Sequence, residues 1–166
     1  GEAIFPVSPS GSPLRNAMTT FDTRCTRQAE RLQRTLGDNM ASALLRPADN
    51  MYSAAKILWM QEQEPLQAVW KYFCFSDYAI FKLCGEAAMD YSMASRTMLF
   101  DVRKKSWCRE AVQACGLTVS QLPQLIPSGV PVANILPSVG ADLGLSPETL
   151  IVSGGHDQQC CAFGVG

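Results

Sequence analysis

Residues 151–159 constrain the fold of this chain more than any other segment, because a short apolar strand runs into a helix through two glycines and a polar cluster. We expect a strand over 150–153, a turn at Gly154 and Gly155, and a helix that starts at His156. Such a layout places side chains at the carboxyl edge of a sheet, where α/β proteins bind ligands. Glycines let a ligand approach the backbone, and the free amides of a helix start favour an anion such as phosphate. The segment therefore predicts an α/β domain with a ligand site at this point.

The rest of the chain alternates between helical patterns and short apolar segments, which is typical of an α/β domain. Ala29, Leu32 and Leu36 recur at helical spacing, so one face of the first helix can be buried. The expected helices span 22–37 with Asp22 or Thr23 as cap, 53–64 with Pro65 as its stop, 76–83 between Ser76 and Gly85, 106 or 107 to 115, and 137–143. The expected strands span 17–21, 71–75, 97–100 and 130–136, and the expected loops span 1–16 and 41–50.

The composition excludes several classes of protein. Lys and Arg number 14 and Asp and Glu number 15, so no basic field is present for nucleic acid. No apolar run approaches the ~20 residues of a membrane span, and the start of the sequence lacks the pattern of a signal peptide. We therefore expect a cytoplasmic protein without nucleic-acid or membrane partners. Charged residues at 17% fall below the usual level of about 25%, which indicates a surface covered by further protein.

The cysteines indicate free thiols. Seven are present at scattered spacing, alongside a single histidine, so neither a disulfide framework nor a zinc site is predicted. A cysteine-based redox protein is an alternative class, but Cys160 and Cys161 are adjacent and poorly placed for a reversible bridge. We expect buried free thiols, as in a reducing compartment, and assign no metal ligand in this chain.

The polar cluster after the two glycines contains the main candidates for chemistry. Asp157 could accept a proton from a hydroxyl that is aimed at a bound phosphate. The alternative is that Asp157 is only a helix N-cap and that the glycines form a plain turn. His156 could be a base or a packing and hydrogen-bonding residue, and Gln158 could bind a hydroxyl or lie in solvent.

Two further segments can be interpreted in more than one way. Residues 51–63 by themselves predict a capped amphipathic helix, with Trp59 in the core and Lys56 solvated or extending its head to solvent. Residues 90–102 contain hydroxyls and Arg96, which could bind a ligand or form a self-bonded loop that braces a strand.

Taken together, the three segments resemble the FGGY family of carbohydrate kinases. The first diagnostic pattern of that family is matched by Met51, Ser53, Lys56, Ile57, Trp59, Met60, Glu62 and Gln63. Residues 94–101 are similar to the stretch that follows in glycerol kinases and their relatives, and residues 155–159 are similar to the family's Gly-x-Asp-Gln/Asn motif. The order and spacing also match, and the resemblance covers essentially the whole chain.

The resemblance implies an actin-like, ribonuclease H-like α/β fold in two lobes with the sugar bound between them. Residues 1–149 would form an incomplete N-terminal, sugar-binding lobe. Residues 150–166 would begin the C-terminal lobe, or the segment between the lobes, and would carry the catalytic aspartate.

The resemblance also implies the reaction. Members transfer the γ-phosphoryl group of ATP to a sugar or polyol hydroxyl with Mg²⁺. Asp157 falls on the family's catalytic base, Gln158 on a position that contacts substrate hydroxyls, and Gly154 and Gly155 would lie near the phosphate. Met51 falls where glycerol kinases carry a substrate-facing tyrosine, a difference that favours a ketopentose or similar sugar over glycerol.

The remaining matched positions imply structural roles. Lys56 and Trp59 are diagnostic of the family, but we expect them to support the fold rather than the reaction. Asp22 and Arg24 fall where relatives often keep a similar pair, and we expect that pair to brace the sheet.

Family members begin with an Asp-x-Gly-Thr hairpin that grips phosphates and magnesium, and they continue into a nucleotide lobe; neither is found in this sequence. We therefore expect an internal piece that lacks the main binding elements for ATP and Mg²⁺ and that alone neither binds ATP well nor turns over. The expected partner is a sugar or polyol, and a homodimer is one option for its assembly. A non-catalytic sugar-binding or assembly domain on the same fold is the alternative function, although the presence of Asp157 favours the kinase.

Overall fold

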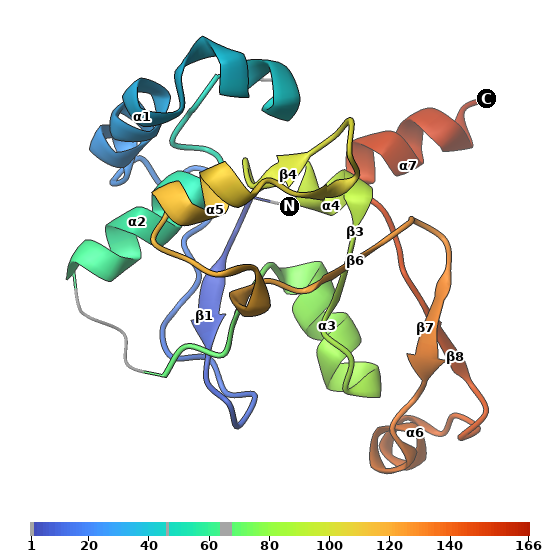
Figure 1. Cartoon of the computed structure of the whole chain (residues 1–166). Coiled ribbons are helices and arrows are strands. Elements are labelled where there is room, and N and C mark those ends of the chain that lie inside the picture. Colours follow the sequence, from blue (N-terminus) through green and yellow to red (C-terminus); the bar gives the residue numbers. More distant parts are fainter. Residues whose placement is uncertain (1, 46, 64–67) are drawn as a thin grey trace.

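The chain folds into helices interspersed with short strands (Figure 1). A computed structural model of the chain describes residues 2–45, 47–63 and 68–166, with the backbone alone for 38–42. The helices are α1 (Thr26–Leu44), α2 (Ser53–Gln63), α3 (Phe75–Cys84), α4 (Tyr91–Ala94), α5 (Arg109–Ala114), α6 (Pro137–Leu143) and α7 (Asp157–Gly164), with a 3₁₀ turn η1 (Val119–Gln121). The strands are β1 (Phe5–Val7), β2 (Lys71–Phe73), β3 (Ala88–Asp90), β4 (Phe100–Asp101), β5 (Ser106–Trp107), β6 (Gln124–Ile126), β7 (Pro131–Asn134) and β8 (Leu150–Val152).

The strands form two-stranded pairs, of which one is parallel within the described ranges. β1 pairs with β2, β4 with β5 and β7 with β8 in the antiparallel sense. β3 and β6 run parallel, so that Ala88 is opposite Gln124 and Asp90 is opposite Ile126. The carboxyl ends of β3 and β6 therefore lie at the same edge, which is where α/β proteins place ligand sites.

Helix α1 is longer than the sequence predicts. Gly37 adopts φ 62° and ψ −178°, which breaks the helical backbone, yet the chain resumes a helix on the far side of this kink. The expected loop over 41–50 is therefore wrong for its first four residues, because a glycine at positive φ kinks the helix without ending it. The N-cap is Cys25, without a side-chain cap hydrogen bond, rather than Asp22 or Thr23.

The sequence predicts the short strands near the start of the chain poorly, because these strands depend on pairing with distant segments. The expected loop over 1–16 contains β1, which pairs with β2 through Phe5 and Phe73. The expected strand over 17–21 is reduced to an isolated bridge between Met18 and Ile4. Strands of two or three residues carry too little periodicity to be recognised, and only the partner strand defines them.

The hairpin of β4 and β5 replaces two further expectations. The strand expected over 97–100 begins only at Phe100, and Trp107 pairs with Phe100 instead of starting a helix. The Asp101 carboxylate accepts the backbone N–H groups of Arg103 and Lys104, each at 3.0 Å, and so closes the turn. Helix α5 consequently begins only after the hairpin.

Other elements match the expectations closely. Helix α6 has the expected bounds with a proline in its first turn, and α2 begins where expected. Gly85 ends α3 in the left-handed region at φ 84° and donates its N–H to the Phe81 carbonyl at 2.7 Å. The expected end of the second helix at Glu64 and Pro65 lies outside the described residues.

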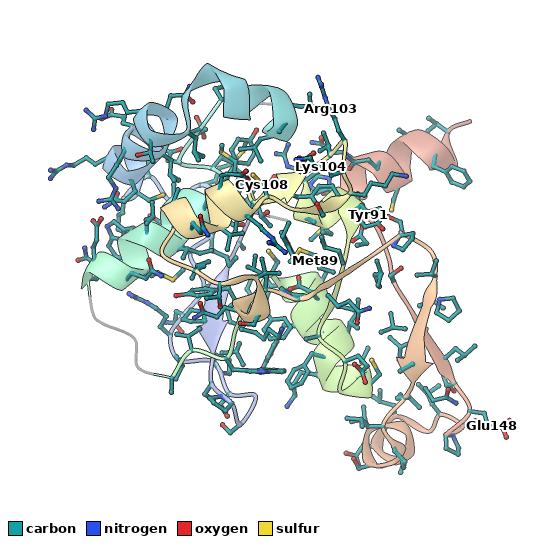
Figure 2. The ribbon with its side chains drawn as sticks, viewed as in Figure 1. Met89, Tyr91, Arg103, Lys104, Cys108 and Glu148 are labelled. Carbon is teal, nitrogen blue, oxygen red and sulfur yellow. The ribbon has the colours of Figure 1, made fainter. Side chains whose placement is uncertain are left out.

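The main hydrophobic core lies between α1, α2, α5 and the strand β3. The side chains of Met89 and Cys108 lie inside it, whereas Arg103 and Lys104 project from the turn between β4 and β5 (Figure 2). Leu32 is buried on the face of α1 that its helical spacing predicts. A smaller aromatic cluster packs β1 and β2 against α3; its members are Phe5, Phe73, Trp70, Tyr78 and Phe81.

All seven cysteines are free thiols, and the expectation that they are buried holds for five of them. The exposed pair is Cys160 and Cys161 on α7. Within the described residues, every helix is too short or too polar to cross a membrane.

A buried carboxyl starts helix α3. Asp77 is 1% exposed, and its carboxylate accepts the backbone N–H of Cys74 at 3.0 Å, so that Cys74, and not the expected Ser76, is the N-cap. Burial raises the pKa of Asp77 to about 8, because hydrogen bonds from the backbone and from Ser76 only partly replace water around the charge.

We predict that the protein loses stability as the pH rises from about 4 to about 8, because the native Asp77 then binds a proton that the unfolded chain has already released. Asp77→Asn should reduce this dependence, since asparagine can still accept the Cys74 N–H without a charge. Denaturant unfolding across this pH range measures the effect, with the exposed Glu86→Gln as control. An equal pH dependence in Asp77→Asn and Glu86→Gln would contradict the prediction.

Candidate active site

Asp90 organises the carboxyl edge of the parallel pair β3 and β6. Its Oδ1 atom accepts the backbone N–H of Ser92 at 2.9 Å and the Ser92 hydroxyl, and thereby caps α4. The same oxygen accepts the hydroxyl of Ser128, beyond the end of β6, at 2.8 Å. One buried carboxylate thus joins the segments that follow both parallel strands.

Helix α7 begins over this edge. The backbone N–H of His156 donates to the Ser92 hydroxyl oxygen at 2.7 Å. A Cβ at Gly155 would lie 3.1 Å from the Cys160 sulfur and 3.5 Å from the Ser92 hydroxyl, so a larger residue here would be tightly packed against Cys160. A Cβ at Gly154 would meet open space.

This arrangement corrects the sequence-based interpretation in one respect. The strand that leads into α7 is β8, and β8 pairs antiparallel with β7 instead of joining the parallel pair. The polar cluster does reach the carboxyl edge of parallel strands, but those strands are β3 and β6, which come from elsewhere in the chain.

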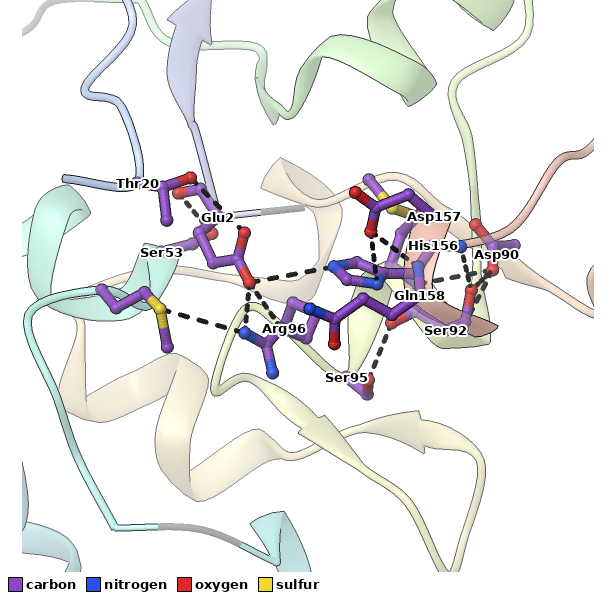
Figure 3. A network of polar contacts seen from close by, with 12 residues as sticks. Glu2, Thr20, Ser53, Asp90, Ser92, Ser95, Arg96, His156, Asp157 and Gln158 are labelled. Atoms are coloured by element: carbon purple, nitrogen blue, oxygen red, sulfur yellow. Dashed lines mark hydrogen bonds and ion pairs between the residues drawn. The ribbon is translucent and has the colours of Figure 1, made fainter. Parts of the chain in front are cut away.

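Asp157 is the first residue of α7, and its side chain is 84% exposed. The N-cap is His156, so the interpretation of Asp157 as a simple N-cap is wrong. The Oδ1 atom of Asp157 accepts the backbone N–H of Gln158 at 2.8 Å, and the Gln158 side chain is exposed beside it (Figure 3). Because most of the Asp157 side chain is exposed, its carboxylate is accessible from solvent.

His156 is buried between two carboxylates. Its Nδ1 atom lies 3.0 Å from Oδ1 of Asp157, and its Nε2 atom lies 3.9 Å from Oε1 of Glu2 (Figure 3). Despite the short distance to Asp157, Nδ1 is buried without a formed hydrogen bond to any of the described residues. The sequence allows His156 to be a base or a packing residue, and its buried position agrees with a packing residue.

Glu2 lies at the centre of the polar network, and the sequence analysis did not find it. Its carboxylate forms an ion pair with Arg96 (Figure 3). The guanidinium of Arg96 also lies over the Tyr52 ring, 5.1 Å from its centre. Burial by itself would raise the pKa of Glu2, but the hydrogen bond from Arg96 and nearby positive charge, including that of Arg96, together outweigh burial and keep the pKa below its ordinary value. No local pattern around Glu2 marks this role, because its partners are distant in the sequence.

Lys56 is fully buried, and the expectation of a solvated lysine is wrong. Its ammonium group donates to the carbonyl of Glu2 at 2.9 Å and to the carbonyl of Met51 at 2.6 Å. Burial lowers the pKa of Lys56, although negative charge nearby, including that of Glu2, opposes the shift. The lysine therefore ties the start of the chain to the segment that precedes α2.

Met51 belongs to the same network. Its sulfur lies 4.0 Å from a guanidinium nitrogen of Arg96, and Arg96 in turn holds Glu2. A continuous series of contacts therefore runs from Met51 through Arg96, Glu2 and His156 to Asp157. The structure thus places two of the predicted site residues, Met51 and Asp157, in one network.

Trp59 and the pair Asp22 and Arg24 form a separate feature at the surface. The Arg24 side chain donates to the Asp22 carboxylate at 2.9 Å, and its guanidinium lies 4.4 Å from the centre of the half-buried Trp59 ring. The hydrogen bond from Arg24 lowers the pKa of Asp22. These contacts brace the start of α1 against α2, and Trp59 is not enclosed in the core.

Comparison with known proteins identifies the family. Residues 1–164 match the description "FGGY family of carbohydrate kinases, N-terminal domain". The chain belongs to the FGGY family of carbohydrate kinases. The expectation from the three sequence motifs is thereby confirmed.

Curated relatives include two xylulose kinases. The chain is 31% identical to that of Bacillus subtilis (strain 168) over 92% of its own length and 31% of the relative's. It is 32% identical to that of Escherichia coli (strain K12) over 92% of its own length and 32% of the relative's. The chain thus spans about a third of the length of these relatives.

A solved structure confirms the fold. The crystal structure of xylulose kinase from Rhodospirillum rubrum superimposes with a TM-score of 0.93 over 99% of this chain and 34% of that chain, at 20% identity. The expected α/β fold of an incomplete actin-like N-terminal lobe is therefore correct.

We predict that Lys56→Met destabilises the protein by about 1–3 kcal/mol, because it removes the ammonium donor from two buried carbonyls and leaves that of Glu2 with the long hydrogen bond from the Ser53 hydroxyl at 3.5 Å. Denaturant unfolding at neutral pH measures the change. Lys82→Met, at an exposed position on α3, is the matched control and should change stability little. Equal stability of the two variants would show that Lys56 does not hold the network together.

Proposed function

We propose that the complete protein transfers the γ-phosphoryl group of ATP to a hydroxyl of a sugar or polyol, with Asp157 as the general base. Membership of the FGGY family of carbohydrate kinases and the xylulose kinases among the relatives support this activity. The observation that carries the residue assignment is the position of Asp157, exposed at the start of α7 and above the carboxyl edge of β3 and β6. The chain spans about a third of its relatives, so the activity is proposed for the complete protein.

The proposed step uses the two oxygens of Asp157 differently. Oδ1 is held by the Gln158 N–H, which leaves Oδ2 to take the proton of the substrate hydroxyl. As the proton moves to Oδ2, the substrate oxygen forms a bond to the γ-phosphorus, and the bond from that phosphorus to the β-phosphate oxygen breaks to release ADP. The Gln158 side chain, exposed beside the base, would hydrogen-bond a second substrate hydroxyl.

We propose that Gly154 and Gly155, which precede α7, and the first turn of α7 lie near the transferred phosphate. Two of the first amides are already used within the protein, by His156 to the Ser92 hydroxyl and by Gln158 to Asp157. The amides of Asp157 and Gln159 are the donors that an approaching anion would meet. Gly154 faces open space, whereas Gly155 is packed against the protein, so Gly154 has more room for a ligand.

ATP is the expected phosphoryl donor because the family consists of carbohydrate kinases. The described residues contain no group of three or more His, Cys, Asp or Glu side chains that could hold a metal ion. Because Mg²⁺ usually takes only one or two protein carboxylates together with substrate phosphates and water, the expected Mg²⁺ stays a prediction for the complete protein. The division of the chain at 149 and 150 and the inactivity of the 166 residues alone stay predictions.

We predict that Asp157→Asn in the complete protein lowers kcat by about 100-fold or more, with a much smaller change in KM, because asparagine cannot take the hydroxyl proton. A coupled assay for ADP with sugar and ATP measures both constants. Asp142→Asn, at an exposed position of α6, is the matched control. Normal turnover of Asp157→Asn would refute the base assignment. If the unaltered complete protein phosphorylates none of the sugars tested, that result would favour the alternative function, a non-catalytic sugar-binding or assembly domain.

We also predict that the complete protein prefers a ketopentose such as xylulose to glycerol, because Met51 gives an apolar contact that cannot donate a hydrogen bond as a tyrosine would. Met51→Tyr should raise the KM for the ketopentose several-fold and lower that for glycerol, with kcat changed less. The measurement is a comparison of both substrates with both proteins. A Met51→Tyr variant with an unchanged KM for each would show that Met51 does not face the substrate.

A further inference from the structure

His156 is held on three sides by the protein. Its backbone N–H is bound to the Ser92 hydroxyl at 2.7 Å, its side chain is 7% exposed, and its Nε2 atom faces the Glu2 carboxylate at 3.9 Å. Glu2 is itself fixed, through the ion pair of its carboxylate with Arg96 and the hydrogen bond of its carbonyl with Lys56. The ring therefore has a defined position before any ligand binds.

The Nδ1 atom of this ring is a buried polar atom without a formed hydrogen bond. Such atoms are uncommon in native proteins and call for an explanation, one of which is a role in catalysis. Its nearest acceptor is Oδ1 of Asp157, at 3.0 Å and poorly aligned. Catalytic hydrogen bonds are often misaligned in the absence of substrate and tighten when it binds.

Asp157 needs such a partner. Its side chain is 84% exposed, and within the described part of the chain it accepts a hydrogen bond from the backbone of the neighbouring Gln158. A carboxylate held this loosely samples several rotamers, and the reaction requires one of them. A fixed donor beside Oδ1 would select the rotamer that turns Oδ2 towards the substrate.

We propose that His156 is a positioning residue for Asp157: its ring, held by burial and by the backbone hydrogen bond to Ser92, presents Nδ1–H to Oδ1 of Asp157 so that Oδ2 faces the substrate hydroxyl. This inference rests on the proposed role of Asp157 as general base. The ring is too deeply buried to contact substrate itself. His156 therefore acts on the reaction through Asp157.

The test compares His156→Asn with His156→Leu in the complete kinase. The side-chain nitrogen of asparagine lies close to where Nδ1 lies in histidine and can donate to Asp157, whereas leucine has a similar size and no donor. We expect His156→Leu to lower kcat about 10- to 100-fold with KM for sugar and ATP nearly unchanged, and His156→Asn to recover most of that loss.

Two controls separate positioning from a merely structural role. Denaturant unfolding of each variant shows whether the protein is folded under assay conditions. The double variant His156→Leu with Asp157→Asn should be no slower than Asp157→Asn by itself, because a positioning residue has no effect once the base is gone. Further loss in the double variant, by the same factor as in the single variant, would overturn the inference.

The remaining outcomes distinguish this inference from the function on which it rests. Equal kcat for His156→Leu and the unaltered protein would overturn the inference, as would an equal loss in His156→Asn and His156→Leu. A raised KM at normal kcat would make His156 a substrate contact and would also overturn it. Normal turnover of Asp157→Asn would remove the proposed function itself, whereas a slow Asp157→Asn beside a normal His156→Leu would remove only the positioning role.

Discussion

The charges of Glu2, Lys56 and Arg96 are the constraint on which this structure depends. A buried charge is costly unless it is paired and its remaining hydrogen-bonding capacity is met. Arg96 meets that requirement for the Glu2 carboxylate, and two backbone carbonyls meet it for the Lys56 ammonium. Because each group is satisfied by a different segment, the start of the chain, the segment before α2 and the loop after α4 must come together or leave a charge unpaired.

That network supports the candidate site from one side, and Asp90 supports it from another. Asp90 joins the ends of β3 and β6, and through Ser92 it receives the first turn of α7. The residues beneath Asp157 are thus held by hydrogen bonds, whereas the Asp157 side chain itself is exposed. For the proposed role of Asp157 as general base, an accessible carboxylate above fixed neighbours is the arrangement that preorganised catalysis requires.

Much of the site was predictable because its motifs are local. The glycines, Asp157 and Gln158 are contiguous, and their spacing alone places them at the start of a helix, as the structure confirms. The diagnostic lysine was recognisable by its spacing within α2, but its burial was not, because an amphipathic pattern cannot reveal that two distant carbonyls take the place of water around Lys56. Glu2 was missed for the same reason, since its partners, Arg96 and His156, are far away in the sequence.

The sequence by itself determined the family, the helices with strong periodicity or clear boundaries, such as α2 and α6, and the polar cluster that begins α7. These follow from interactions between residues close in the chain, which a pattern of residue types records directly. Only the tertiary structure decided which strands carry the site, the extent of α1 beyond Gly37, and the burial of Lys56. These features depend on long-range pairing, where the favourable contact of one segment is supplied by another that its own sequence does not specify.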